Sequence, residues 1–174
     1  RSADPMPATR WFEGARLNLV EQVFRHDGLA TPAIVYDSEA AGRGEIGWPE
    51  LRRQVGALAR TLRQLGVQPG DRIAGYLPNI PQAVVAFLAA ASLGAVWALC
   101  APDMGPVSVT DRWQQIGPTV MVAVDGYRFA GKPFDRRAAL EDILAALPTV
   151  RHVVWVPHLD PAAAPPAQAA RRTV

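Results

Sequence analysis

One loop of the chain collects residue types that bind anions. It covers residues 125–134 and contains Arg128 together with Lys132, the single lysine of the sequence. Ala130 and Gly131 lie between these two cations, and their small size would let an anion approach the backbone while the cations supply charge. The spacing therefore predicts a candidate anion-binding loop.

Two aromatic residues of the same loop, Phe129 and Phe134, could flank a flat ring. Together with the cations they are compatible with a ligand that carries both an aromatic ring and a negative charge. The alternative is an ordinary solvated cationic loop with its aromatic side chains tucked beneath it. Spacing alone leaves both interpretations open.

The sequence contains one glycine pattern of the kind that binds dinucleotides, Gly-x-Gly-x-x-Gly at residues 42–47. In a dinucleotide site the helix begins within the pattern, so that its N-terminus faces the pyrophosphate. Here the predicted helix begins only after Gly47, and no acidic residue ends the next predicted strand. We therefore interpret this segment as a glycine-rich hairpin.

Other motifs that would indicate catalysis or metal binding do not occur: the sequence has no Walker A loop, GxSxG elbow, HExxH helix or paired-cysteine motif. Cys100 is the single cysteine, which excludes an intrachain disulfide and a cysteine-based zinc site. A lone cysteine also suits a reducing compartment, so we expect a cytoplasmic protein. The three histidines are scattered and are interpreted as ordinary solvated or hydrogen-bonded side chains. From the residues alone we thus name no catalytic residue and no metal ligand.

Composition limits the classes of partner. The chain has 174 residues, of which 49% are hydrophobic and 20% charged, values typical of a soluble globular protein. Its 18 basic and 16 acidic side chains give a formal net charge of +2, too small to attract nucleic acid. The longest apolar stretch, 83–101, is interrupted by Gly94 and is interpreted as a buried helix followed by a strand, not as a membrane span.

The elements that must position the loop alternate between strand and helix. Apolar runs predict strands at 33–36, 46–48, 72–77, 96–100, 120–124 and 152–156. Helices are predicted at 18–24, 49–65, 82–93, 107–116 and 136–147, a loop at 125–135, and a linker or frayed end from residue 160 onward. This alternation predicts an α/β fold, a Rossmann-like parallel sheet with helices on both faces, with ligands at the carboxyl ends of its strands.

Several segments resemble known proteins. Residues 66–81, with the sequence GVQPGDRIAGYLPNIP, and the following 83–96 resemble the early core block of adenylate-forming acyl-CoA synthetases. The lead-in WFEGARLN at 11–18 is similar to the branch that holds acetyl-CoA and acetoacetyl-CoA synthetases. Three further segments, 100–105, 111–116 and 122–137, are most similar to acetoacetyl-CoA synthetases. Ala98, Leu99 and Ala101 depart from the small hydroxyl residues that are more usual there.

The resemblance implies a two-step ligase that uses ATP, Mg²⁺ and coenzyme A. Acetoacetate would attack ATP to give an acyl-adenylate and pyrophosphate, and the thiol of coenzyme A would then displace AMP. The resemblance divides the chain into a lead-in at 1–10, the N-terminal part of the AMP-binding domain at 11–160 and an Ala/Pro-rich tail at 161–174. The phosphate loop of these enzymes and their C-terminal catalytic lysine do not occur here, so we expect an N-terminal fragment that is inactive and self-associates when alone.

The resemblance also assigns the candidate loop. In the relatives, its counterparts contact the nucleotide end of coenzyme A, which implies that seven residues bind or neighbour it here: Arg128, Ala130, Gly131, Lys132, Phe134, Pro102 and Asp103. Two alternatives remain open. The chain could be a stand-alone, non-catalytic module that binds a nucleotide or coenzyme A, or part of another short-chain acyl-CoA synthetase, such as one for acetate.

Overall fold

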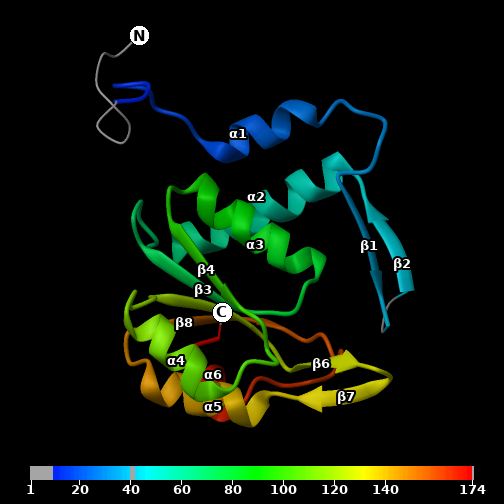
Figure 1. Ribbon diagram of the computed structural model, residues 1–174, viewed down its shortest axis with the longest axis vertical. Coiled ribbons are helices and arrows are strands. Elements are labelled where there is room, and N and C mark those ends of the chain that lie inside the picture. The colour runs from blue at the N-terminus through cyan, green and yellow to red at the C-terminus, as the bar shows by residue number, and fades with distance from the viewer. Residues whose placement is uncertain (1–9, 40–41, 174) are drawn as a thin grey trace.

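The computed structural model describes residues 10–39 and 42–173 (Figure 1). Its helices are α1 (Leu19–Val23), the 3-10 helix η1 (Phe24–His26), α2 (Trp48–Gln64), α3 (Pro81–Ser92), α4 (Pro106–Gln114), α5 (Arg137–Ala146) and α6 (Ala167–Ala170). Its strands are β1 (Ile34–Ser38), β2 (Gly42–Ile46), β3 (Arg72–Tyr76), β4 (Val96–Cys100), β5 (Val120–Val124), β6 (Gly126–Phe129), β7 (Lys132–Asp135) and β8 (His152–Val156). No helix of the described residues is long and apolar enough to cross a membrane.

A four-stranded parallel sheet in the order β4-β3-β5-β8 forms the centre of the molecule. Helices α2 and α3 cover one face, and α4, α5 and α6 cover the other (Figure 1). Strand β5 is buried along its whole length, with Val120, Val122 and Val124 in the first core and Met121 and Ala123 in the second. This two-sided burial explains its unbroken apolar sequence. The predicted Rossmann-like parallel sheet is confirmed.

Helix α2 follows the apolar spacing of its sequence. Leu51, Val55, Ala59 and Leu62 recur every three or four residues and are all buried, while the opposite face carries arginines. Pro49 lies in the first turn, where its missing N–H leaves no helical bond unmade. Each buried leucine contributes about 2 kcal/mol relative to an exposed one, so this stripe holds the helix on the core.

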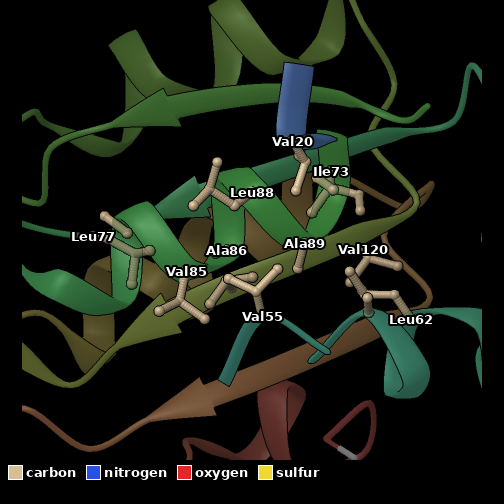
Figure 2. Packing of buried hydrophobic residues seen from close by; sticks show 14 of the residues in the cluster. Val20, Val55, Leu62, Ile73, Leu77, Val85, Ala86, Leu88, Ala89 and Val120 are labelled. Carbon is tan, nitrogen blue, oxygen red and sulfur yellow. The ribbon is translucent and has the colours of Figure 1, made fainter. Parts of the chain in front are cut away.

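Helix α3 is buried on nearly every side. Figure 2 shows Val85, Ala86, Leu88 and Ala89 of α3 among residues contributed by α1, α2, β3 and β5. Small alanines let the neighbouring elements approach closely, and Ala89 is completely inaccessible. The helix thus packs against α2 and against β3 and β4, which positions the loop after β3 at the carboxyl edge.

The glycine pattern at 42–47 serves a hairpin, as predicted, although β2 begins earlier than the predicted strand at 46–48. Strand β2 pairs antiparallel with β1, and Gly44 lies opposite Tyr36. A Cβ atom on Gly44 would come within 2.4 Å of the Tyr36 ring, so the absence of a side chain there lets the tyrosine cross its partner strand.

Two segments differ from their predictions. The predicted loop 125–135 contains the antiparallel hairpin β6–β7, whose two-residue turn has positive φ angles at Ala130 (50°) and Gly131 (73°). The predicted linker or frayed end contains α6, which packs on α5 and β8, and Thr173 forms a bridge with Val153. Ala169 of α6 is fully buried, so a small alanine contact stabilises a segment whose composition indicates a flexible tail.

Candidate functional site

A cavity of about 370 Å³ lies at the carboxyl edge of the sheet. The loops that follow β3 and β4 form its wall, together with two aromatic side chains of β6. Its lining residues are Pro78, Asn79, Ala101, Pro102, Asp103, Tyr127 and Phe129. The structure therefore brings the predicted neighbours Pro102 and Asp103 against the hairpin that carries the predicted anion-binding residues.

Phe129 and Phe134, the two aromatic residues expected to flank a ring, do not both line the cavity. Phe134 does not line the cavity; its ring stacks on Tyr127 of the paired strand, with centroids 5.1 Å apart and an angle of 12° between the planes. Tyr127 and Phe129, two residues apart on β6, both line the cavity. Phe129 is 65% exposed, so its face is open to a ligand. The pair that could contact a flat ring is thus Tyr127 and Phe129, with Phe134 as support.

Arg136 holds Tyr127 from the start of α5. Its guanidinium lies 5.3 Å from the centre of the Tyr127 ring and donates a hydrogen bond of 3.1 Å to the phenolic oxygen. A cation close to an aromatic face and a donor on its hydroxyl both restrict the ring. Sequence reasoning treated Arg136 only as the beginning of a helix and overlooked this role.

Tyr76 fixes the loop that carries Pro102 and Asp103. It is fully buried at the end of β3, and its hydroxyl lies 3.0 Å from the carbonyl oxygen of Pro102 and 3.2 Å from that of Met104. Burial raises the pKa of Tyr76 to about 12, which keeps the hydroxyl protonated and able to donate. The Trp113 ring meets it edge-on at 6.3 Å. This tyrosine therefore positions one wall of the cavity.

A second hollow, of about 530 Å³, lies on the other side of the hairpin. Glu39, Arg128, Gly131, His158, Leu159 and Pro161 line it. Arg128 and Lys132 are both exposed, and Arg128 donates a hydrogen bond of 3.2 Å to the carbonyl oxygen of Gly131. Lys132 lines neither hollow. The seven predicted residues thus lie on one hairpin and the adjacent loop, but only four of them line a hollow: Pro102 and Asp103 line the first, and Arg128 and Gly131 line the second.

The backbone N–H groups of the hairpin turn contact an acidic side chain. Ala130 donates to Oε1 of Glu39 at 3.0 Å, and Gly131 donates to Oε2 at 2.7 Å. The two N–H groups of this turn thus bind a carboxylate of the chain itself. No local pattern indicated Glu39, which lies 91 residues before Ala130 in the sequence.

Asp125 joins the hairpin to the loop after β8. Its carboxylate is only 2% exposed and accepts hydrogen bonds from the backbone N–H groups of His158 (2.7 Å), Leu159 (2.8 Å) and Asp160 (2.7 Å). Burial lowers the pKa of His158, and the nearby Asp125 charge opposes that shift. The position of Asp125 directly after a buried strand was the one sequence clue to this role.

The described residues contain no group of three or more His, Cys, Asp or Glu side chains that could hold a metal ion. Cys100 is buried at the end of β4, and burial raises the pKa of its thiol. A protonated, buried thiol is a poor nucleophile. What the edge does present is aromatic surface from Tyr127 and Phe129 and the exposed cations Arg128 and Lys132.

Comparisons with known proteins match the chain to one family model and to acetoacetyl-CoA synthetases. A family model described as AMP-binding enzyme matches residues 21–173. The chain is 40% identical over 154 residues to the acetoacetyl-CoA synthetase of Rattus norvegicus, which covers 87% of the chain and 23% of that protein. It is 38% identical over 149 residues to the acetoacetyl-coenzyme A synthetase of Rhizobium meliloti, a match that covers 84% of this chain and 23% of that protein.

A solved structure agrees with these matches. The acetoacetyl-CoA synthetase from Streptomyces lividans superposes with a TM-score of 0.88 and 49% sequence identity. The match covers 97% of this chain and 26% of that one. The chain thus spans about a quarter of the length of the relatives it matches, at 23% of the curated proteins and 26% of the solved structure.

Proposed function

This chain belongs to the AMP-binding enzyme family, and we propose that the protein of which it forms part is an acetoacetate–CoA ligase. The observation that carries the proposal is the similarity to acetoacetyl-CoA synthetases across almost the whole chain, at 49% identity to a solved structure. The reaction would activate acetoacetate with ATP as an acyl-adenylate and then transfer the acyl group to coenzyme A. The described residues present no metal-binding cluster, so we assign them no role in holding Mg²⁺.

Within that reaction, we assign the β6–β7 hairpin to the nucleotide end of coenzyme A. Three features support this assignment. The hairpin lies at the carboxyl edge of the sheet, where ligands of such folds bind. Tyr127 and Phe129 offer aromatic surface to a ring in the cavity that Pro102 and Asp103 complete. Arg128 and Lys132 are exposed cations that form no ion pair with any other described side chain.

The decisive experiment separates the two half-reactions in the complete protein. Arg128→Ala should raise the KM for coenzyme A about ten- to hundredfold, because a charge-assisted hydrogen bond is worth about 1.5–3 kcal/mol. ATP–pyrophosphate exchange with acetoacetate, which needs no coenzyme A, should stay near the parent rate. Lys132→Ala should act in the same direction but less, since an ammonium lacks the bidentate fork of a guanidinium.

Two comparisons sharpen this test. Dephospho-coenzyme A, which lacks the 3′-phosphate, should lose affinity for the parent protein but be less sensitive to Arg128→Ala. Arg60→Ala is the matched control, because Arg60 is an exposed arginine on α2, away from the hairpin. If Arg128→Ala slows adenylation as much as thioester formation, the hairpin is structural and the coenzyme A assignment is wrong.

We also propose that these 174 residues alone do not form the acyl-adenylate, because no Ser/Thr/Gly-rich phosphate loop ending in lysine occurs in their sequence. Exchange of labelled pyrophosphate into ATP should remain at background with the purified chain. Clear turnover would contradict this proposal.

We propose further that the isolated chain self-associates. Strand β4 is an edge of the sheet, and its Val96 and Leu99 are 49% and 48% exposed. Trp11, Phe12 and Leu17 are 66%, 85% and 82% exposed. Unpaired strand edges and exposed apolar side chains favour association. Light scattering that shows a monodisperse monomer would argue against it.

A further inference from the structure

The turn of the β6–β7 hairpin presents two backbone donors that the strand pairing does not use. Phe129 pairs with Lys132, so Ala130 and Gly131 are the two residues of the turn, and both have positive φ angles. Their N–H groups therefore take no part in the strand pairing. Successive N–H groups in such a conformation form a concave site that binds anionic oxygen. Nothing lies within 4 Å of a Cβ built on Gly131, so the glycine is needed for its φ of 73° and not for space.

Glu39 occupies this donor pair with both of its carboxylate oxygens, one on each N–H, at 3.0 and 2.7 Å. The residue follows β1 directly, so the contact joins the β1–β2 hairpin to the β6–β7 hairpin (Figure 1). Glu39, Ala130 and Gly131 are all exposed. Exchange of the carboxylate for another anion would therefore require no opening of the core.

The electrostatic surroundings favour an anion with more charge than one carboxylate. Arg128 and Lys132 flank the turn, and neither forms an ion pair within the described part of the chain. Arg128 is held beside the turn by its hydrogen bond to the Gly131 carbonyl oxygen, and it lines the same hollow as Glu39. A phosphate monoester dianion has three terminal oxygens and two charges, so it would satisfy both N–H groups and still reach a cation.

We propose that Glu39 is an internal competitor for phosphate: its carboxylate occupies the turn in the free protein, and a ligand phosphate displaces it and releases the β1–β2 hairpin from the β6–β7 hairpin. The identity of the ligand as coenzyme A rests on the proposed function above, whereas the competition itself concerns any phosphate dianion. A carboxylate that must leave first lowers the apparent affinity by the fraction of time that it occupies the site.

A purely structural clasp would behave in the opposite way. If Glu39 only holds the turn in its binding shape, its removal loosens the turn and weakens phosphate binding. If it competes, its removal frees both donors and strengthens binding. The sign of the change in phosphate affinity therefore decides between the two roles.

The test titrates inorganic phosphate into the isotope-labelled chain at constant ionic strength and follows the Ala130 and Gly131 amide signals by relaxation-optimised NMR. Glu39→Gln should lower the dissociation constant about fivefold, which corresponds to an occupancy of about 80% by Glu39 in the parent chain. Glu45→Gln is the matched control, because Glu45 is exposed on β2 of the same hairpin and the charge change is identical. It should change the constant less than twofold.

A second variant removes the contact but keeps the charge. Glu39→Asp is one methylene shorter, so it cannot reach both N–H groups at the observed backbone spacing, and it should also tighten phosphate binding. Equal effects of Glu39→Gln and Glu45→Gln, or weaker binding in both Glu39 variants, would overturn the competitor role. In either case, phosphate shifts at Ala130 and Gly131 would leave the coenzyme A assignment standing. If neither amide responds to phosphate in any variant, both proposals fail.

Discussion

The carboxylate of Asp125 braces the carboxyl edge of the sheet, and its replacement should have a large and local effect. It is nearly inaccessible and accepts three backbone hydrogen bonds of 2.7, 2.8 and 2.7 Å from residues 158–160. In Asp125→Asn, the oxygen that bonds His158 and Leu159 can be retained. The other oxygen becomes an NH₂ group that faces the N–H of Asp160, donor against donor.

The expected loss of stability follows from the number of hydrogen bonds that each variant removes. Asp125→Asn loses one hydrogen bond to a charged acceptor, worth about 1.5–3 kcal/mol, so we expect a destabilisation of about 2 kcal/mol. For a chain of 150–250 residues this corresponds to a fall in melting temperature of about 4–8 °C. Asp125→Ala loses all three hydrogen bonds, and we expect about 3–5 kcal/mol, limited by the access of the freed loop to water.

Two measurements check this prediction. The midpoint of urea unfolding should fall while its slope is unchanged, and amide exchange at residues 158–160 should accelerate more than exchange in the core strands. Asp142→Asn is the control, because Asp142 is exposed on α5. If the two asparagine variants have the same midpoint, or if exchange at 158–160 is unchanged, the carboxylate does not brace the loop.

Three further predictions concern the same edge. Tyr76→Phe removes the donor to the loop after β4 and should destabilise the chain by about 1–2 kcal/mol, measured by urea unfolding. Burial lowers the pKa of His158 from its ordinary value of 6.5, so the unfolded state binds the proton more readily than the folded state. The stability that depends on neutral His158 is therefore complete above pH 6.5 and is lost as the pH falls through the folded pKa. His158→Gln should flatten this part of the curve of unfolding free energy against pH, and an unchanged curve would refute the assignment. Gly126→Ala would place a Cβ 2.3 Å from the carbonyl oxygen of Phe134 and should cost at least about 2 kcal/mol, whereas Gly56→Ala, on the open face of α2, should stabilise by about 0.5–1 kcal/mol in the same assay.

Apolar runs predicted the parallel sheet well because its central strands β3 and β5 are buried and its outer strands β4 and β8 are still apolar in sequence. The strands at 96–100, 120–124 and 152–156 have the predicted bounds. Strand β2 was predicted at the wrong residues because its sequence, GRGEI, has neither an apolar run nor a clear alternation. The segment is a strand because it pairs with β1, so a tertiary contact decides the structure where the local preference is weak.

The β6–β7 hairpin was missed because its turn residues are unusual. A two-residue turn with both φ angles positive is most often Asn-Gly or Asp-Gly, whereas this one is Ala-Gly. Pro133 within the second strand also argues against a strand, although an edge strand tolerates it. The alternation of Tyr127 and Phe129 was the available clue, since it places both rings on one face of a strand.

The contacts that organise the site join residues far apart in the sequence, and strand order decides which of them meet. Val124 pairs with Val156 because β5 and β8 are neighbours, so the residues just beyond them, Asp125 and His158, are brought together. Periodicity shows that both are strands but not that they are adjacent. The same adjacency brings His158 to the hollow that Glu39 and the hairpin turn share, so the brace at Asp125 also sets the far wall of the phosphate site that we propose. An Asp125 variant should therefore weaken phosphate binding at the turn even though Asp125 does not line that hollow.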